Sequence, residues 1–294
     1  MKKKVLFDVL IFLLIALFIY FAGFRKEISP YNTNPIAVIY LEGTIGEDYG
    51  NTFNSKDVEK ILTEIEDLHP KGVILRISSP GGTVYETDRI YNLIKNFKQK
   101  NNIKVYVSMG EVCASGGYYI SMAGDRIYAE PLTETGSIGV IMNLVNYEEL
   151  LKKIGINIIT IKSGKFKDIG SPYRELSKEE LEMFENMINE LYEKFILVVK
   201  GGRKNLDEKT IRNLAQGQIY LGEDAYKLGL IDKIGTLDDA INDLKSDLNL
   251  KSITIKEYRI QKSFWENFLS IASKVLTQYK NPSETIFEYK FTAY

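Results

Sequence analysis

Gly72-Val-Ile-Leu-Arg-Ile-Ser-Ser-Pro-Gly-Gly82 runs from an apolar segment into a turn that contains proline and glycine. A helical pattern of apolar residues follows at residues 83–100, and a second apolar segment at residues 105–109. The order strand, helix, strand is typical of a βαβ unit, in which the two strands are parallel. The stretch therefore predicts a strand at residues 72–77 in a sheet that helices cover.

The same alternation continues on both sides of this unit. The pattern predicts further strands at residues 36–41, 126–129, 138–142 and 158–162, and helices at residues 55–68, 115–122, 147–154, 177–200 and 237–248. Ser55 and Ser177 are candidate N-cap residues for two of these helices. The expected fold class is α/β, with a largely parallel β-sheet flanked by helices.

The composition excludes several classes of function. A net charge of −1 offers no basic surface for nucleic acid. The single cysteine, Cys113, forms no internal disulfide, and no Cys/His pattern suggests a metal site. Cys113 is either a thiol nucleophile or a small buried residue, and we expect the second. The sequence implies no cofactor.

The N-terminus predicts a membrane anchor. Met1-Lys-Lys-Lys4 precedes residues 5–24, which are apolar apart from Asp8. About 20 residues cross the ~30 Å hydrocarbon layer as a helix. Because the lysines precede the span, the positive-inside rule keeps the N-terminus in the cytoplasm and places the rest of the chain outside. A cleaved signal peptide is the alternative, but residues 20–25 offer no clean cleavage site.

Ser115 is the candidate nucleophile. It lies in the small-residue turn Cys113-Ala-Ser-Gly-Gly-Tyr-Tyr119, and a serine hydroxyl attacks well only when a base takes its proton. The only histidine is His69, in a loop before Pro70, so a lysine is the expected base. Lys167, in the polar loop 163–171, is the best-placed candidate. A free lysine has a pKa of ~10.4, so a lysine base requires an environment that lowers this value by roughly 2–3 units. A solvated loop lysine is the alternative reading.

Backbone amides near Ser115 are candidate oxyanion donors. The loop Ser78-Ser-Pro-Gly-Gly82 is either a plain tight turn or a source of unobstructed N–H groups. The N–H of Gly116, together with that of Gly81 or Gly82, would form a two-donor hole. The P-loop, G-x-S-x-G and S-x-x-K motifs are absent around these residues, which argues against a phosphate cradle, an α/β-hydrolase and a penicillin-binding type of enzyme.

Five segments in order resemble the SppA-type signal peptide peptidase family. These are membrane-anchored Ser/Lys proteases related in fold to the Clp protease subunit and to crotonases. The resemblance covers roughly residues 36–239. It rests on Ile74-Leu-Arg-Ile-Ser-Ser-Pro-Gly-Gly82, Ala114-Ser-Gly-Gly-Tyr-Tyr119, Thr135-Gly-Ser-Ile-Gly139, Lys167-Asp-Ile-Gly-Ser-Pro-Tyr-Arg-Glu175 and Ala215-Gln-Gly-Gln-Ile-Tyr-Leu-Gly222.

The resemblance implies a role for each candidate residue. Ser115 matches the nucleophile and Lys167 the general base, with Lys165 as the rival base. Ser137 matches a serine that orients the lysine. The family's oxyanion segment falls on Gly81, Gly82 and Gly116. The resemblance also implies a homo-oligomeric ring whose active sites are completed between neighbouring subunits.

The expected function is that of a serine endopeptidase which degrades released signal peptides and other hydrophobic, unfolded peptides through an acyl-enzyme. Ala114, Tyr118 and Tyr119 around the serine suggest a preference for apolar side chains. We expect an anchor at residues 1–27, a tether at 28–35, the peptidase domain at 36–248 and a C-terminal extension at 249–294. The expected location is the cell membrane, as a single-pass protein with an extracytoplasmic catalytic domain. The alternatives are a stomatin-linked membrane protease, a crotonase-like acyl-CoA enzyme and an inactive membrane scaffold.

Overall fold

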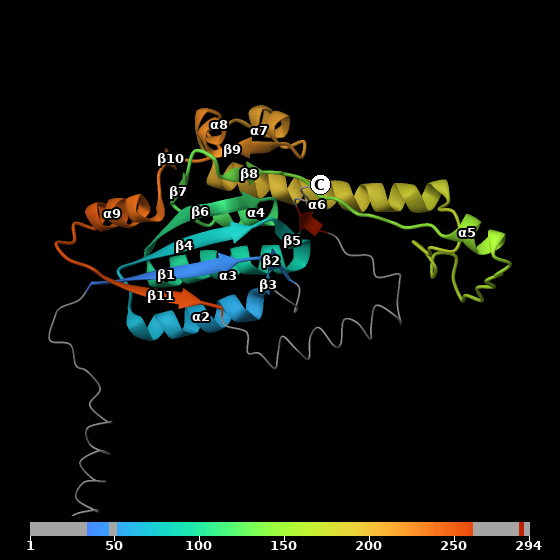
Figure 1. Ribbon diagram of the computed structural model, residues 1–294, viewed down its shortest axis with the longest axis horizontal. Helices are drawn as coiled ribbons and strands as arrows, with labels where there is room; N and C mark the ends of the chain where they lie inside the picture. Colours follow the sequence, from blue (N-terminus) through green and yellow to red (C-terminus); the bar gives the residue numbers. More distant parts are fainter. Residues whose placement is uncertain (1–33, 47–51, 261–287, 291–294) are drawn as a thin grey trace, which may run out of the picture. The chain divides into compact units, whose positions relative to one another are not determined.

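The computed structural model describes residues 34–46, 52–260 and 288–290 (Figure 1). Its main sheet has the order β10-β7-β6-β4-β1-β11, and all neighbours on this path are parallel. The short strand β8 pairs in parallel with the end of β6, and β9 is antiparallel to β8. The strands are β1 (Pro35–Glu42), β4 (Gly72–Ser79), β6 (Lys104–Ala114), β7 (Arg126–Ala129), β8 (Glu134–Gly136), β9 (Ile219–Leu221), β10 (Lys233–Ile234) and β11 (Thr254–Arg259). The predicted α/β class with a mostly parallel sheet is confirmed.

Both faces of the main sheet are buried, as expected for parallel strands covered by helices. Successive side chains of a strand point to opposite faces, so one strand supplies two cores. In β1, Ala37, Ile39 and Leu41 belong to the larger core. Ile36 and Val38 belong to the smaller one.

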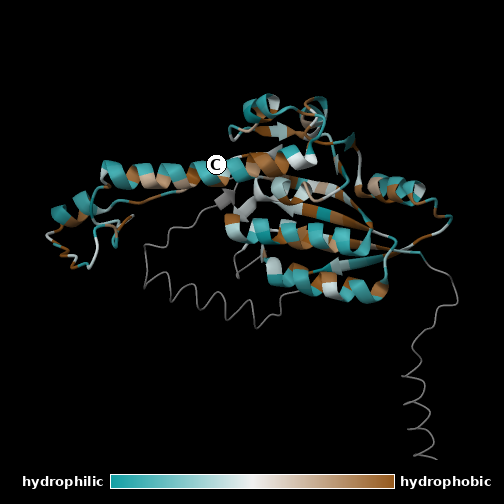
Figure 2. Ribbon diagram, turned by 180° about the vertical axis from the view of Figure 1, so that it is seen from behind, coloured by the Kyte–Doolittle hydropathy of each residue, from teal (hydrophilic) through white to brown (hydrophobic). Residues whose placement is uncertain are grey.

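The helices divide between the two faces of the sheet. They are α2 (Ser55–Leu68), α3 (Val84–Asn101), α4 (Gly116–Ser121), α5 (Glu148–Lys153), α6 (Lys178–Gly202), α7 (Glu208–Leu214), α8 (Gly222–Lys227) and α9 (Leu237–Asp247). Buried residues of α2, α3, α4 and the C-terminal half of α6 join the larger core. Helix α9 packs against the other face. Figure 2 shows that apolar residues are concentrated in the half of α6 that lies on the sheet.

A second, smaller sheet lies next to the carboxyl end of β4. It has the order β12-β5-β2-β3 and consists of β2 (Thr44–Ile45), β3 (Thr52–Phe53), β5 (Gly81–Thr83) and β12 (Glu288–Lys290). Strand β5 is parallel to β2 on one edge and antiparallel to β12 on the other. The predicted glycine turn is therefore extended backbone that pairs on both sides.

One predicted helix cap is confirmed and one is wrong. Ser177 caps α6, and its side chain accepts a hydrogen bond from the Glu180 N–H, while the Glu180 carboxylate accepts one from the Ser177 N–H. The cap of α2 is Asn54 rather than Ser55, since the Asn54 side chain accepts from the next backbone amides. The Ser55 N–H instead donates to Glu86 Oε2 at 2.6 Å, which links α2 to α3.

The predicted strands at residues 138–142 and 158–162 are wrong. Only Ile141 forms an isolated bridge in the first segment, and the second is irregular. A strand is stabilised by a hydrogen-bonded neighbour and a buried face. Neither is available here, because residues 139–194 contain only two buried residues, Pro172 and Glu180. We call residues 139–187 the arm; they include α5 and the N-terminal half of α6 (Figure 1).

Within the described ranges, no helix combines the length and apolarity required to cross a bilayer. The predicted span at residues 5–24 lies outside these ranges. Strand β11 lies in the main sheet beside β1, so residues after 248 contribute to it. The proposed domain boundaries stay predictions.

Candidate active site

Ser115 occupies a strained turn between β6 and α4. Its φ of 52° and ψ of −115° lie in a region that residues with a side chain rarely adopt. Such a conformation costs of order 1–3 kcal/mol and persists only where the surroundings enforce it. Two backbone bonds hold it here: the Ser115 N–H donates to Gly136 O at 2.8 Å, and the Ser115 C=O accepts from the Tyr119 N–H at 2.9 Å. The turn places the serine at the carboxyl end of β6, where α/β sheets commonly bind ligands.

Close backbone contact explains the glycine that follows the serine. A Cβ on Gly116 would lie 2.7 Å from Thr87 Oγ1 and 3.2 Å from Gly81 Cα. Any larger residue at position 116 would separate α4 from α3 and from the Gly81 segment. The small-residue turn therefore brings the nucleophile candidate against β5.

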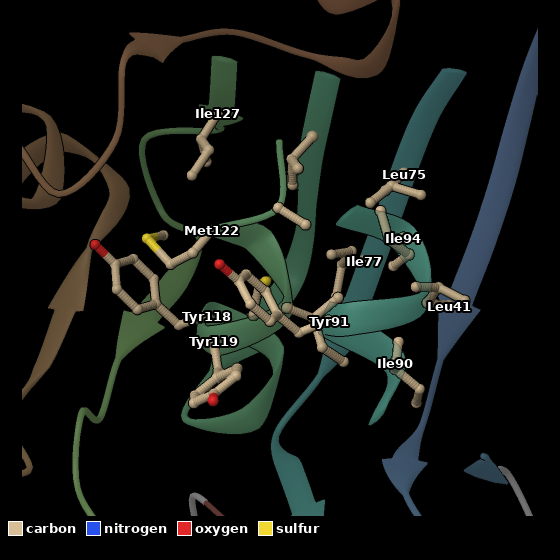
Figure 3. Packing of buried hydrophobic residues seen from close by; sticks show 14 of the residues in the cluster. Leu41, Leu75, Ile77, Ile90, Tyr91, Ile94, Tyr118, Tyr119, Met122 and Ile127 are labelled. Atoms are coloured by element: carbon tan, nitrogen blue, oxygen red, sulfur yellow. The ribbon is translucent and has the colours of Figure 1, made fainter. Parts of the chain in front are cut away.

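Two tyrosines fix α4 within the core (Figure 3). The Tyr118 hydroxyl donates to Leu230 O at 2.9 Å, and the Tyr119 hydroxyl donates to Asp88 Oδ1 at 2.7 Å. The ring centroids of Tyr119 and Phe195 are 5.0 Å apart, which joins α4 to α6. Both tyrosines are fully buried. They pack inward and position the turn, so they give no support to the predicted preference for apolar substrates, which stays a prediction.

The candidate oxyanion amides gather beside Ser115. Gly116 is the first residue of α4, and the first N–H groups of a helix have no acceptor within it. The Gly81 N–H donates to Ser79 Oγ at 3.1 Å and is already partnered. Gly82 lies so close to β2 that a Cβ would be 1.9 Å from Ile45 O. Among the described residues, no side chain accepts a hydrogen bond from the N–H of Gly116 or of Gly82. These two amides are therefore the better candidates for the oxyanion donors.

Ser137 follows the residue that accepts a hydrogen bond from the Ser115 backbone. That residue is Gly136, and the Ser137 N–H donates to Gln218 O at 2.7 Å. Its φ of 49° gives a second left-handed turn next to the serine. The structure therefore brings together Ser115, Ser137 and the glycine amides.

Lys167 is held on the arm by a cluster of charged residues. Arg174 binds Asp168 through Nε and Nη2, both at 2.9 Å, and binds Glu180 through Nη1 at 2.8 Å. Lys162 adds an ion pair with Asp168 at 2.5 Å. Hydrogen bonds from Arg174 hold the pKa of Glu180 down at about 2 and also lower that of Asp168. The cluster fixes the loop of the exposed Lys167 to the first turn of α6.

Within one chain, the arm keeps Lys167 away from Ser115. The Lys167 loop is tied to Glu180, near the start of α6, whereas the Ser115 helix contacts Phe195 further along the same helix. At 1.5 Å rise per residue, these two points on α6 are about 22 Å apart. The role of Lys167 as base stays a prediction, and a single chain does not bring it to the serine.

The rival residues are placed unfavourably for catalysis. Burial raises the pKa of the Cys113 thiol to about 12, so it is a poor source of thiolate. His69 ends α2 at the opposite end of β4, and the length of that strand separates it from Ser79 by about 23 Å. Lys165 forms an ion pair with Glu179 on the arm.

The sequence analysis did not predict the cluster of Arg174, Asp168 and Glu180 on the arm. Arg174 and Glu180 are six residues apart across a helix start, a separation without a periodic signal. The available sign was the capping box of Ser177 and Glu180, which predicts where the helix begins but not that its glutamate also binds an arginine.

Comparison with known proteins identifies the family. Residues 97–251 match Peptidase family S49, and residues 38–135 match the Clp protease family. A putative protease of Methanocaldococcus jannaschii is 38% identical over 81% of this chain and 78% of its own length. A putative signal peptide peptidase SppA of Enterococcus faecium is 42% identical over 68% of this chain, which spans 59% of that relative.

A solved structure of a membrane-bound stomatin-specific protease mutant in complex with a substrate peptide has a TM-score of 0.48 and 16% identity. It covers 83% of this chain and 100% of that chain, and at these values the likeness bears on neither activity nor substrate. The match to the Clp protease family agrees with the Clp-like fold. The chain belongs to peptidase family S49 and is a serine peptidase of the SppA type.

Proposed function

We propose that this protein is a membrane-anchored endopeptidase in which Ser115 is the nucleophile. The observation that carries the proposal is the backbone of Ser115, which is strained and buried at the end of β6 in a chain of family S49. Strain at a position that packing alone does not require is a sign of function. Among the described residues no hydrogen bond engages Ser115 Oγ, so the hydroxyl is available for a base.

The proposed base is Lys167 of a neighbouring copy of the chain. The arm separates Lys167 from Ser115 within one chain. Most of the exposed large apolar side chains among the described residues belong to the arm. Many exposed apolar side chains on one segment are a sign of an interaction site. The exposed apolar side chains of the arm are Ile141, Val145, Tyr147, Leu150, Ile154, Ile156, Ile158, Ile159, Ile161, Leu181, Met183 and Met187. A head-to-tail contact repeated around a closed ring would bury them and bring each Lys167 to the next Ser115.

The chemistry then proceeds by acyl transfer. Neutral Lys167 Nζ takes the proton of Ser115 Oγ as this oxygen attacks the scissile carbonyl carbon. The N–H groups of Gly116 and Gly82 stabilise the oxyanion. The lysine ammonium next gives the proton to the leaving amine. A water molecule, deprotonated by the same lysine, then attacks the Ser115 ester, and the lysine returns this proton to Ser115 Oγ as the ester C–O bond breaks. Ser137 orients the ammonium in this scheme.

The proposed substrates are released signal peptides and other hydrophobic, unfolded peptides. The support is the relative named as a signal peptide peptidase and the apolar N-terminal segment, which would keep the enzyme at the membrane where such peptides arise. The proposed location is the cell membrane, with the N-terminus in the cytoplasm and the catalytic domain outside.

Fluorophosphonate labelling tests the nucleophile, and mixing of variants tests the shared site. Wild type is expected to be labelled and to cleave peptides, whereas Ser115→Ala and Lys167→Ala are each inactive. Co-expression of the two inactive variants is expected to restore about a quarter of wild-type activity, because random mixing pairs an intact serine with a neighbour's intact lysine at that frequency.

Co-expression of Lys167→Ala with the double variant Ser115→Ala/Lys167→Ala is the control and restores nothing. Absence of recovery in the first mixture would show that Lys167 does not act between subunits. Labelling of Ser115→Ala at the wild-type level would reject Ser115 as the nucleophile.

A further inference from the structure

Strand β6 contains a bulge just before the Ser115 turn. At the bulge, Ser78 of β4 alone lies opposite residues 110–112 of β6, so β6 holds two residues more than β4. The close approach requires a glycine, because a Cβ on Gly110 would lie 2.6 Å from Ser78 Cβ. At the same point β6 changes its other neighbour from β7 to β8. Bulges beside functional sites redirect a strand and the side chains that follow it.

The bulge determines which part of the glycine segment lies level with Ser115. After the bulge Cys113 is opposite Ser79, and in the same register Ser115 is level with Gly81. In the register that β6 has before the bulge, Ser115 would be level with Thr83 instead. Two residues of a strand correspond to a displacement of about 7 Å. The candidate nucleophile therefore meets the candidate oxyanion amides only in the register that the bulge creates.

Side chains from neighbouring elements bind the carbonyl groups of the bulge. Arg76 Nη1 donates to Met109 O at 2.6 Å, and Thr133 Oγ1 donates to Gly110 O at 2.9 Å. A bulge interrupts the backbone ladder, and buried carbonyl groups need a donor. These two side chains supply donors at the place where the ladder is interrupted, and they fix the bulge in one conformation.

The two donors are connected through the turn between β7 and β8. The Glu130 N–H donates to Thr133 Oγ1 at 3.2 Å, and the Glu130 carboxylate forms an ion pair with Arg76 at 3.6 Å. The buried Thr133 hydroxyl thus accepts one hydrogen bond and donates another, and it immediately precedes β8. Strand β8 in turn supplies Gly136 O, which accepts the hydrogen bond from the Ser115 N–H.

We propose that Thr133 and Arg76 are positioning residues for the nucleophile. They act through the carbonyl groups of the β6 bulge, which fix the register in which Ser115 meets the oxyanion amides. This inference rests on the proposed function of Ser115. A bulge without its donors is free to shift, and a misplacement of about 1 Å at the reacting atoms can lower a rate about 100-fold.

Thr133→Val and Thr133→Ser form a matched pair for the test in the full-length protein. Valine keeps the branched shape and lacks the hydroxyl, whereas serine keeps the hydroxyl. The valine variant is expected to lower the rate of fluorophosphonate labelling and the kcat for a fluorogenic apolar peptide by about 10- to 100-fold. Its KM is expected to stay within about twofold of wild type, since the bulge does not bind substrate. The serine variant is expected to recover most of the lost rate.

Ile241→Val separates positioning from a general loss of stability. Ile241 is buried in the core on the other face of the sheet, away from the bulge. The substitution is expected to lower the midpoint of thermal unfolding and to leave the labelling rate of the folded protein unchanged. Equal slowing in Ile241→Val and Thr133→Val would overturn the proposal, and so would a Thr133→Val protein that is labelled at the wild-type rate.

Arg76→Met tests the bulge independently of whether Thr133→Val folds. Methionine keeps an unbranched apolar stem and removes the donor to Met109 O, so labelling is expected to slow by a similar factor. The Ser115 amide is expected to exchange its hydrogen faster than in wild type, because β6 and β8 are held together less firmly. Unchanged exchange together with unchanged labelling would overturn the proposal. Failure of the proposed function appears separately, as a wild-type protein that fluorophosphonate does not label.

Discussion

Gly116→Ala is the substitution whose effect follows most directly from the coordinates. The added Cβ would lie 2.7 Å from Thr87 Oγ1, 3.0 Å from Ile45 Cδ1 and 3.2 Å from Gly81 Cα. The Ile45 atom is the end of a flexible side chain, whereas Gly81 contributes backbone and Thr87 branches at Cβ on a helix, so its χ1 is restricted. The contact is relieved mainly by moving α4, together with the Ser115 turn, away from β5.

The expected cost is that of overpacking, about 1–3 kcal/mol. For a protein of this size, this lowers the midpoint of thermal unfolding by about 2–12 °C. Catalysis should suffer more than stability, because a shift of the nucleophile by a fraction of an ångström relative to the oxyanion donors lowers kcat/KM by about 10- to 100-fold. Unfolding is followed by calorimetry and activity by cleavage of a fluorogenic apolar peptide.

Gly201→Ala is the matched control. Gly201 also lies in a helix, but a Cβ there meets nothing within 4 Å. The alanine is expected to leave activity unchanged and to stabilise the protein by up to about 1 kcal/mol. The double variant Gly116→Ala/Thr87→Ala removes the closest contact and is expected to recover part of the lost stability. A Gly116→Ala enzyme with a wild-type midpoint and kcat/KM within twofold of wild type would refute the close-packing argument.

Lys167→Arg is expected to be as inactive as Lys167→Ala, because a guanidinium does not give up its proton at any usable pH, whereas Lys165→Ala keeps most activity; near-normal turnover of the arginine variant in the peptide assay would exclude the lysine base. His69→Ala is expected to keep wild-type kcat/KM, since the residue lies at the far end of β4, and an inactive but folded variant would reassign the base. The Arg174 hydrogen bonds lower the pKa of Glu180 from its ordinary value of ~4.3 to about 2, so their contribution to arm stability is complete above pH ~4.3 and lost as pH falls toward 2. The resistance of the arm to an added protease is therefore expected to stay constant between pH 8 and 5, even if activity falls in that range. Increased cleavage of the arm between these pH values would contradict this expectation. Arg174→Ala is expected to lower kcat and expose the arm to the protease while the body stays folded, and unchanged arm cleavage would show that the cluster does not hold it.

Periodicity predicted the parts of the fold that bury a regular face. The strands of the main sheet and helices such as α2 and α3 each place apolar residues at the spacing of their own structure, and burial of those residues stabilises them locally. The segments at 138–142 and 158–162 have the same apolar character but no neighbouring strand. An apolar pattern shows that a segment could form a strand, but the strand forms only where a neighbouring strand is available to hydrogen-bond with it.

The candidate site also has a part that the sequence predicted and a part that it did not. The Ser115 turn could be recognised because its glycines stand next to one another in the sequence, and the reason is the close contact of Gly116 with Gly81 and Thr87. The pairing of β12 with β5 could not, because residues 81–83 and 288–290 lie at distant points of the chain and carry no complementary pattern. Backbone pairing at an edge leaves little trace in the sequence, since it requires so little of the side chains.

The two residues of the proposed dyad, Ser115 and Lys167, are positioned by different kinds of interaction. Ser115 is fixed by burial and by backbone strain, which only a rigid core can maintain. The loop that carries Lys167 is fixed by ion pairs between its neighbours, such as Arg174 and Asp168, on an arm that exposes many apolar side chains. A lysine in solvent is protonated, and water has to be excluded from it before it can act as a base. The contact that would bury the arm is thus also the one that would remove water from the lysine, so assembly and activation of the base become a single event. An unassembled chain would then be unable to cleave the proteins around it.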